Sequence, residues 1–531
     1  MGAFASIWHS LALALNPSLR ICCSGGQPVP LPSCLMALSC SAAAALLVLW
    51  ATGALSPAGR HRALVLSLTI YLVVNLFPLN VGALLWLRRA LDERSPLELL
   101  VFVAGIAGLV GAYRVARPRS EQGRSVATTA ANVFATTLLA LTAVTGLRGW
   151  ITGSEQRAHA VARAITQDNT RSLPVKGPYP DIYYIVLDGY GRADVLRDVY
   201  RFDNGGFLRD LERRGFRVAA RARSNYQQTY PSLASSLNLT YLDRLATVQP
   251  PSRRVMQYLI EHAALVESLK TAGYRVVVFP THYAATATAP LADVMGDNHA
   301  VAPWVPPLVA QTPLWLLPPV RRVQHEQHRR TVIETLERLP ELSDVPRPRF
   351  VFAHVLSPHP PFVLGADPTP AQPYMINDGS HFPGSRADYL TGYASQVRRL
   401  NPLLQRMLDR LLVPTRPAPV VILQGDHGPG STLDWSSFDS TDHRERSGIL
   451  AAYLVPDAVK ARLYDEVTPV NAWRIILRGA LGADYDTLPD ASYYAPWTQP
   501  FEFQQAPDES AAPGNTGRGT TGSVADRSTR R

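Results

Sequence analysis

The sequence predicts a membrane-anchored α/β protein, in which a bundle of N-terminal transmembrane helices precedes a domain with a mostly parallel central sheet. The first observation is the distribution of charge: before Arg88, the only charged side chains are Arg20, Arg60 and Arg62. The second is an alternation of strand-like and helix-like segments after residue 178, which is typical of a parallel sheet covered by helices. A chain of 531 residues has room for both units.

Four apolar stretches in the N-terminal part are long enough to span a bilayer, which takes about 20 residues of helix. They are residues 34–55, 64–87, 98–116 and 127–147. A fifth stretch, 4–19, is short and is interrupted by Asn16 and Pro17, so we expect four or five spans. No acidic or basic side chain lies in the middle of a span, which favours an anchor over an ion pathway.

The orientation of the spans follows from the arginines of the short loops, because basic loops stay in the cytoplasm. The loop at 114–126 is the most basic and carries Arg114, Arg117, Arg119 and Arg124. With this loop in the cytoplasm, the next span delivers the chain beyond residue 148 to the outside. We therefore predict a multi-pass protein of the inner or plasma membrane with an extracytoplasmic C-terminal domain.

Composition divides the chain into four parts. They are a transmembrane region at 1–147, a juxtamembrane linker or helix at 148–177, a folded domain at 178–500 and a disordered tail at 501–531. The net charge of +10 comes mainly from scattered arginines without a basic stripe, so we predict no nucleic-acid partner. All four cysteines precede residue 41, which excludes disulfides, thiolate metal sites and a cysteine nucleophile from the folded domain.

Strands and helices alternate along the folded domain. Residues 181–187 (DIYYIVL) form a continuous β-branched and aromatic run, which is typical of a strand buried on both faces. Further strands are predicted at 274–279, 349–355, 419–424 and 448–455. Helices are predicted at 193–214, 253–272, 386–412 and 469–481. The Pro- and Ala-rich segment 284–325 is interpreted as an irregular insertion.

Side chains suited to metal binding follow three of these strands. Asp188 follows the first strand, His359 follows the strand at 349–355, and Asp426 and His427 follow the strand at 419–424. Ligands of an open α/β sheet bind beyond the carboxyl ends of its strands, so these loops should converge. Each motif alone is more often a turn or a surface histidine, but together they offer two carboxylates and two imidazoles. Such a set suits Zn or Mn.

A threonine supplies a candidate nucleophile. Thr229 precedes Pro231, and proline is favoured in the first turn of a helix. Thr229 therefore lies just before a predicted helix N-terminus, where the helix dipole and free N–H groups favour an anion. The alternative is that Thr229 or Ser232 only caps the helix.

These motifs, in this order, resemble the alkaline phosphatase/sulfatase superfamily. The resemblance rests on Asp188, on Thr229 with its proline, on the Pro-His-Pro-Pro loop around His359 and on Gly-Asp-His-Gly at 425–428. It covers about residues 178–497, and the segments 468–474 and 488–490 fit the closing part of such domains. The layout of the whole chain is similar to that of lipoteichoic acid synthases and phosphoethanolamine transferases.

The resemblance implies one firmly bound divalent metal, Zn or Mn, held by Asp188, Asp426, His427 and Thr229, and it leaves a second metal open. Thr229 would also be the nucleophile and would form a covalent phospho-enzyme. The physical chemistry agrees with this role, because a metal stabilises an alkoxide and polarises a phosphoryl oxygen.

The resemblance also implies roles for three further histidines. His359 would contact the oxygens of the transferring group or protonate the leaving group. His443 falls where related transferases place another histidine that contacts the substrate. His354 is a candidate for substrate binding as well, although its place within a predicted strand fits a structural role equally well.

The chain departs from ordinary sulfatases at the nucleophile. Those enzymes convert a Cys or Ser in a Cys/Ser-x-Pro-x-Arg setting to formylglycine. Here the corresponding run is Thr229-Tyr230-Pro231-Ser232-Leu233. Threonine replaces the convertible residue and leucine replaces the arginine, so we do not expect formylglycine chemistry.

Three functions remain open from the sequence. The first is a phosphotransferase that moves a phosphoalcohol head group from a membrane lipid donor to an envelope glycan or lipid acceptor. The second is a hydrolase of the same fold, a phosphodiesterase or another sulfuric or phosphoric ester hydrolase, with water as the acceptor. The third is a membrane sensor whose catalytic domain has decayed, although every expected ligand type is present.

Overall fold

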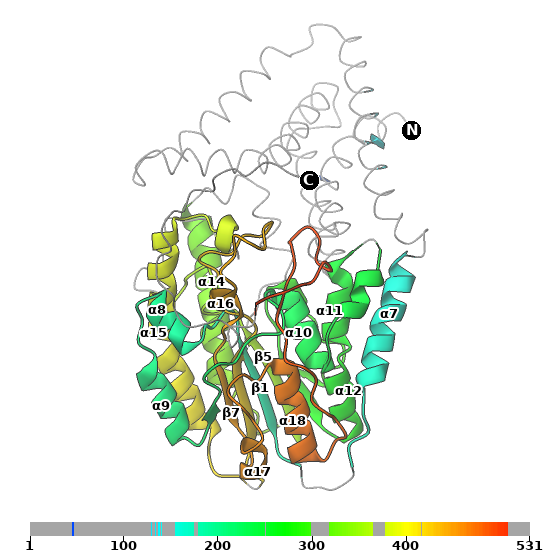
Figure 1. The fold of residues 1–531 in the computed structure, drawn as a ribbon, viewed down its shortest axis with the longest axis vertical. Coiled ribbons are helices and arrows are strands. Elements are labelled where there is room, and N and C mark those ends of the chain that lie inside the picture. Colours follow the sequence, from blue (N-terminus) through cyan, green and yellow to red (C-terminus); the bar gives the residue numbers. More distant parts are fainter. Residues whose placement is uncertain are drawn as a thin grey trace, which may run out of the picture.

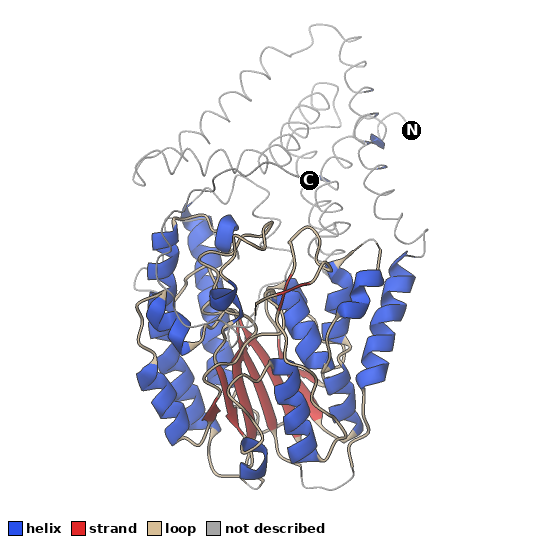
Figure 2. Cartoon of the chain, in the orientation of Figure 1, coloured by secondary structure: helices blue, strands red, loops and turns tan. Residues whose placement is uncertain are grey.

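The computed structural model describes residues 154–174, 179–249, 251–298, 318–364, 378–415 and 417–507, with a few isolated positions before residue 141. These residues form one α/β unit with a sheet between two layers of helices (Figures 1 and 2). Within these ranges, no helix is both long and apolar enough to cross a membrane. Apart from those isolated positions, the spans predicted within 1–147 lie outside the described residues, as does the tail beyond residue 507.

The central sheet has seven strands in the order β2-β7-β6-β1-β5-β3-β4. The strands are β1 (Ile182–Leu187), β2 (Arg217–Val218), β3 (Arg275–Phe279), β4 (Val294–Met295), β5 (Arg349–Val355), β6 (Val420–Gly425) and β7 (Ala451–Leu454). The five strands from β6 to β4 run parallel, whereas β7 and β2 add an antiparallel edge. The predicted mostly parallel sheet is confirmed, and the predicted strand at 448–455 is an antiparallel one.

Helices cover both faces of the sheet, which explains the uninterrupted apolar sequence of β1. Tyr184 and Val186 pack in the core on one face, and Ile185 and Leu187 pack in the core on the other. The first face carries α7 (Ser154–Asn169), α10 (Thr229–Asn238), α11 (Arg253–Glu261), α12 (Ala264–Thr271) and α18 (Pro469–Leu481). The second face carries α8 (Ala193–Asp198), α9 (Gly205–Arg213), α14 (Pro318–Arg338) and α15 (Arg386–Leu411).

Short elements complete the described fold. They are η1 (Asp243–Thr247), η2 (Ala284–Thr286), η4 (Gly379–His381), α16 (His443–Ser447), α17 (Asp457–Lys460) and the hairpin of β8 (Tyr493–Tyr494) and β9 (Gln504–Gln505).

Two helices that the sequence predicts as single are each divided in the structure. The segment 193–214 contains α8 and α9, because Arg201 takes a left-handed conformation with φ of 53° between them. The segment 253–272 contains α11 and α12, because Ala263 is extended between them. The side chain of Asn238 accepts a hydrogen bond from the backbone N–H of Ala264 at 3.1 Å and so satisfies the first turn of α12. Such a long-range cap leaves no local sequence signal.

Helix α7 lies within the predicted juxtamembrane linker and belongs to the packed core. Its residues Ala158, Ala162 and Ile165 are buried against the α10 side of the sheet. The packed core therefore includes residues that precede 178.

Candidate metal and nucleophile site

Three strand ends meet at the carboxyl edge of the sheet, as parallel topology requires. Strand β1 lies between β5 and β6, so the loops after these strands are neighbours. The backbone N–H of His359 donates to the carbonyl of Asp188 at 2.9 Å. The N–H of Gly189 donates to Asp426 Oδ1 at 3.0 Å. These bonds hold the three predicted loops together.

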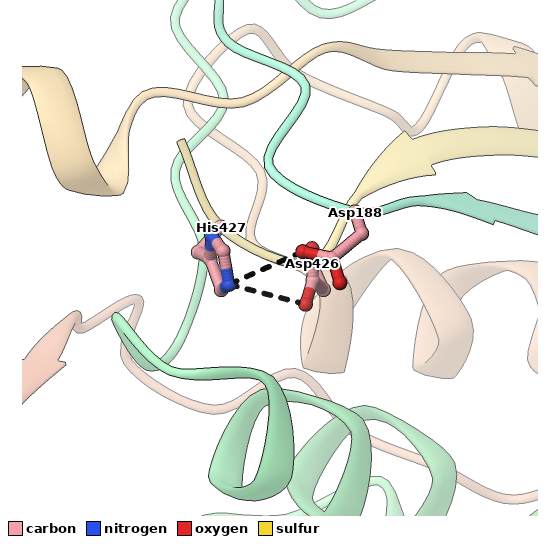
Figure 3. A group of neighbouring side chains, drawn as sticks. All are labelled: Asp188, Asp426 and His427. Atoms are coloured by element: carbon pink, nitrogen blue, oxygen red, sulfur yellow. Dashed lines mark ion pairs between the residues drawn. The ribbon is translucent and has the colours of Figure 1, made fainter. Parts of the chain in front are cut away.

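Asp188, Asp426 and His427 form a cluster of three possible metal ligands, with one donor atom of each within 4.8 Å of the others (Figure 3). His427 Nε2 lies 3.5 Å from Asp188 Oδ1 and 3.4 Å from Asp426 Oδ2. All three side chains are buried, and neither of these two carboxylate oxygens accepts a hydrogen bond. Buried carboxylate oxygens without donors are costly unless a cation neutralises them. The cluster therefore fits a divalent metal.

The hydrogen bonds of His427 identify the ring nitrogen that faces this cluster. Its Nδ1 lies 2.9 Å from the carbonyl oxygen of Gly428, which can only accept, so Nδ1 carries the proton. Nε2 is then the unprotonated nitrogen, and it lies beside both carboxylates. Burial and the charge of Arg446 lower the pKa of His427 to about 4, so the ring is neutral near pH 7. A neutral imidazole with an oriented lone pair is the form that binds metals.

Thr229 is the first residue of α10, and its hydroxyl oxygen lies 3.1 Å from His427 Nε2. The hydroxyl therefore donates to His427. Among the described residues, no backbone N–H of α10 donates to this hydroxyl, which favours the nucleophile interpretation over a cap. Ser232 is not a cap either, because it lies within α10, and its hydroxyl donates to the carbonyl of Asp426 at 2.5 Å. That bond ties the start of α10 to the metal cluster.

His359 lies in the same cavity, on the β5 side of the cluster. Its Nδ1 bonds the carbonyl of Pro360 at 2.7 Å, and its Nε2 lies 3.3 Å from Asp378 Oδ2. Burial opposes the protonated form, but the negative charges of Asp188 and Asp378 outweigh burial and raise the pKa to about 9. His359 is therefore placed to present a positive charge and a proton to a bound group.

The other two predicted histidines lie outside the wall of the cavity at Thr229. His354 is buried within β5 behind Asp188, with Nε2 3.5 Å from Asp188 Oδ2 and Nδ1 3.0 Å from the hydroxyl of Thr286. His443 is half-buried at the start of α16, where its Nδ1 lies 3.0 Å from Gln227 Nε2 and its ring packs against Phe438 with the ring planes tilted by 39°. Neither of them lines the cavity at Thr229, and their substrate roles stay predictions.

The cavity above Thr229 has a volume of about 120 Å³ and contains a residue that sequence reasoning missed. Besides Asp188, His359 and His427, its wall includes the guanidinium of Arg446 and the rings of four aromatic residues, Tyr230, Tyr283, Trp435 and Trp497. Arg446 follows His443 by three residues, which is a weak signal in retrospect. Asp378, which pairs with Arg446, has no local signal at all.

Comparison with known proteins places the chain in a family. Residues 180–455 match the family model described as Sulfatase, which is more than half of the chain. No curated protein matches the sequence.

Several solved structures are similar at low identity. The integral membrane lipooligosaccharide phosphoethanolamine transferase A from Neisseria meningitidis is 13% identical, with a TM-score of 0.40, 91% of this chain and 96% of that chain covered. A phosphonate monoester hydrolase of Agrobacterium radiobacter is 13% identical, with a TM-score of 0.38, 59% of this chain and 80% of that chain covered. The zinc complex of the periplasmic domain of EptC from Escherichia coli is 12% identical, with a TM-score of 0.36, and the match covers 60% of this chain and 87% of that chain.

The family match extends from the strand that precedes Asp188 to the strand that follows Arg446, so it includes all the metal-ligand candidates and the nucleophile. The chain therefore belongs to the sulfatase family of the alkaline phosphatase/sulfatase superfamily, and it is a sulfatase-like enzyme, a phosphotransferase or an ester hydrolase.

Proposed function

We propose that the protein is a membrane-anchored, metal-dependent phosphotransferase that moves a phosphoalcohol head group from a membrane lipid to a glycan or lipid of the cell envelope. The observation that carries the proposal is the position of the Thr229 hydroxyl. It lies at the start of α10 and donates to the unprotonated nitrogen of His427, beside two carboxylate oxygens that accept no hydrogen bond. A hydroxyl in this setting is suited to attack a phosphorus atom.

The residues that would hold the metal are Asp188, Asp426, His427 and Thr229, with Zn or Mn as the expected ion. When bound, a divalent cation here would favour the alkoxide form of a neighbouring hydroxyl and would withdraw charge from a phosphoryl oxygen. The start of α10 adds the positive end of a helix dipole and free N–H groups, which favour an anion at the same place.

Transfer would then proceed in two displacements at phosphorus. In the first, Thr229 Oγ1 bonds the phosphorus, its proton leaves to solvent, and the bond to the lipid oxygen breaks. His359 gives its Nε2 proton to that oxygen, so the lipid leaves as an alcohol. In the second, an acceptor hydroxyl bonds the phosphorus and the bond to Thr229 breaks. Thr229 Oγ1 then takes a proton from solvent, and the acceptor's proton goes to His359.

The decisive experiment compares the full-length wild type with Thr229→Ala for metal content and for turnover of a p-nitrophenyl phosphodiester. We expect about one equivalent of metal in the wild type and loss of at least about 10³-fold in kcat for the variant, since the nucleophile itself is removed. Ser235→Ala is a matched control, because it removes a buried hydroxyl nearly two turns farther along α10. Among the described residues, the one hydrogen bond of this hydroxyl is to the carbonyl of Ser232. Unchanged turnover in Thr229→Ala would refute the proposal.

A hydrolase remains the second candidate, and the family model favours it because sulfatases are ester hydrolases. The same site serves both functions, because water and a glycan hydroxyl attack the covalent intermediate in the same way. Turnover that rises with added envelope glycan or lipid, with the phosphoalcohol recovered on the acceptor, distinguishes the transferase. Turnover that is independent of acceptor and releases the free phosphoalcohol identifies the hydrolase.

A further inference from the structure

Helix α14 buries a row of polar side chains. His325, His328, Thr331 and Thr335 are each at most 4% exposed, and they follow one another at a spacing of three or four residues. This spacing places them on one side of the helix. Apolar side chains would pack there at a lower cost of desolvation, so polar groups at these positions indicate hydrogen bonds that the fold uses.

His328 uses its place in this row to bind the loop after β5. Its Nε2 lies 2.8 Å from the carbonyl oxygen of Leu356, which is the first residue beyond the strand. That oxygen can only accept, so Nε2 carries the proton. Burial and the neighbouring ring of His282, with the two ring centroids 4.8 Å apart, hold the pKa of His328 well below its usual value. The ring is therefore a neutral donor with its one proton at Nε2.

This bond fixes the start of the loop that carries His359. The side chain of Leu356 packs in the core of the first face of the sheet, whereas its carbonyl oxygen meets α14 on the second face. Three residues later, the N–H of His359 donates to the carbonyl of Asp188 at 2.9 Å. The loop is thus held at both ends, by α14 and by β1. A shift of Leu356 would reach the His359 ring over only three residues.

We propose that His328 is a positioning residue for His359, because its Nε2–H fixes the carbonyl of Leu356 and thereby the place of the His359 ring in the cavity above Thr229. The inference rests on the proposed function, in which His359 protonates the leaving group, and it adds α14 to the machinery of that step. A proton donor must lie within hydrogen-bond reach of the leaving oxygen. A displacement of about 1 Å is enough to cost a factor of about 10² in rate.

The first test varies the leaving group, so that it separates the position of the proton donor from the rest of catalysis. p-Nitrophenolate leaves a phosphodiester without a proton, whereas an alkoxide needs one. In the zinc-loaded full-length protein, we expect His328→Leu to lower kcat/KM about 10- to 100-fold for a diester with an alkyl leaving group. For the p-nitrophenyl diester of the same phosphoalcohol, the loss should stay below about threefold. Equal losses on both substrates would overturn the proposal.

His328→Gln is the conservative variant, because it keeps a donor. The side-chain Nε2 of glutamine carries N–H groups and can donate to the same carbonyl of Leu356. We expect this variant to retain kcat/KM for the alkyl substrate within about fivefold of the wild type, where the leucine variant does not. A glutamine variant as impaired as the leucine variant would show that the N–H is not what matters, which contradicts the inference.

Thr335→Val is the matched control on the same helix. Thr335 lies about two turns beyond His328, and its hydroxyl bonds the carbonyl of Thr331 at 2.7 Å and Asn298 Nδ2 at 2.8 Å. The variant removes a buried polar group of α14 that has no hydrogen bond to the loop after β5. It should lower the unfolding temperature and leave the ratio of the two kcat/KM values within about twofold of the wild type. A ratio that changes as much as in His328→Leu would show a general loosening of α14 and sink the inference.

Amide hydrogen exchange tests the contact without turnover. The N–H of His359 is protected by its bond to Asp188, and opening of the loop exposes it. We expect His328→Leu to speed exchange at His359 about tenfold or more, with exchange in the centre of β1 unchanged. An unchanged rate at His359, or an equal rise in both places, would refute the positioning role. Failure of the proposed function is a separate outcome, because turnover that survives Thr229→Ala refutes that function whatever the exchange rate at His359.

Discussion

Asp188 illustrates, at the scale of one residue, how a binding site is built at the expense of stability. Its Oδ1 is buried without a hydrogen bond, and it lies beside a second carboxylate, Asp426. Burial raises the pKa of Asp188, because a charge without solvent is unfavourable. The side chain therefore destabilises the metal-free fold and becomes favourable only with a cation present.

Asp188→Asn should separate these two effects. In the presence of a chelator, we expect the free energy of unfolding of the variant to exceed that of the wild type by about 1–2 kcal/mol, because one uncompensated buried charge is removed. In excess zinc the order should reverse, since the loss of a carboxylate ligand weakens metal binding and its stabilisation. Thermal unfolding with and without chelator measures both. A variant that is less stable than the wild type in chelator would contradict the argument.

The residues of the site differ in how visible they are in the sequence. Asp188, Asp426 and His427 follow strands directly, so parallel topology alone brings them together. Arg446 and Asp378 are 68 positions apart, and their contact depends on how two loops cross the sheet edge. No periodicity or turn pattern encodes such a contact, which is why the sequence predicts the metal ligands and misses this ion pair.

At the scale of elements, the ends of helices are set by contacts that sequence patterns do not reveal. The apolar period continues through 253–272, yet the chain breaks between α11 and α12. The break is stabilised by Asn238, at the end of α10, whose side chain accepts from Ala264 N–H and donates to the carbonyls of Ala234 and Leu259 at 2.8 Å each. One buried amide thus joins three helices.

Asn238→Ala should therefore destabilise the protein without changing the chemistry. The side chain is 0% exposed, so its loss leaves one backbone donor and one inter-helix carbonyl without partners. We expect the free energy of unfolding to fall by about 2–4 kcal/mol. Denaturant unfolding measures the loss, and kcat/KM at a temperature where the variant is folded should stay within about twofold. A loss under about 0.5 kcal/mol would show that water replaces the amide.

The link between α8 and α16 gives a prediction about pH. Asp194 is partly buried, which opposes its charged form, but hydrogen bonds and ion pairs with Arg192 and Arg444 outweigh burial and lower its pKa. A carboxyl with a lowered folded-state pKa adds stability at pH values above its unfolded value of 3.8, and this stability is lost as pH falls through the folded pKa.

Asp194→Asn should thus lower the free energy of unfolding at pH 7 by about 1 kcal/mol, a modest value because the side chain is 28% exposed. The gap between variant and wild type should shrink as pH falls below 3.8. Urea unfolding of both proteins at pH 7, 5 and 3 measures it. A gap that is constant over this range would mean that packing, and not charge, is lost.

At the scale of the whole molecule, the sequence predicts the layered α/β domain because its strongest signals are the runs that form β1, β5 and β6. These strands are buried on both faces, so their composition is nearly independent of context. The antiparallel edge of β7 and β2 was less visible, because strand direction depends on the path of the chain and not on the residues of the strand. Helix α7 is polar on average, so its sequence alone does not indicate that it packs in the core.

The position of α7 in the core gives the last prediction, which concerns how the folded unit is delimited. Ala158, Ala162 and Ile165 are buried under α11 and α12, and the hydroxyl of Thr166 bonds Asn238. A fragment of residues 178–507 would expose this face of the core, whereas a fragment of residues 150–507 would keep it covered. Removing these apolar contacts should cost about 3 kcal/mol or more.

We therefore expect the longer fragment to be soluble and to unfold cooperatively, and the shorter one to unfold at least about 6 °C lower or to aggregate. The comparison is made by differential scanning calorimetry on both fragments. Ile165→Ala in the longer fragment is the control, because it weakens the same contact without shortening the chain and should fall between the two. Equal unfolding temperatures for both fragments would show that α7 packs on the domain without contributing to its stability. The stable folded unit would then begin at β1.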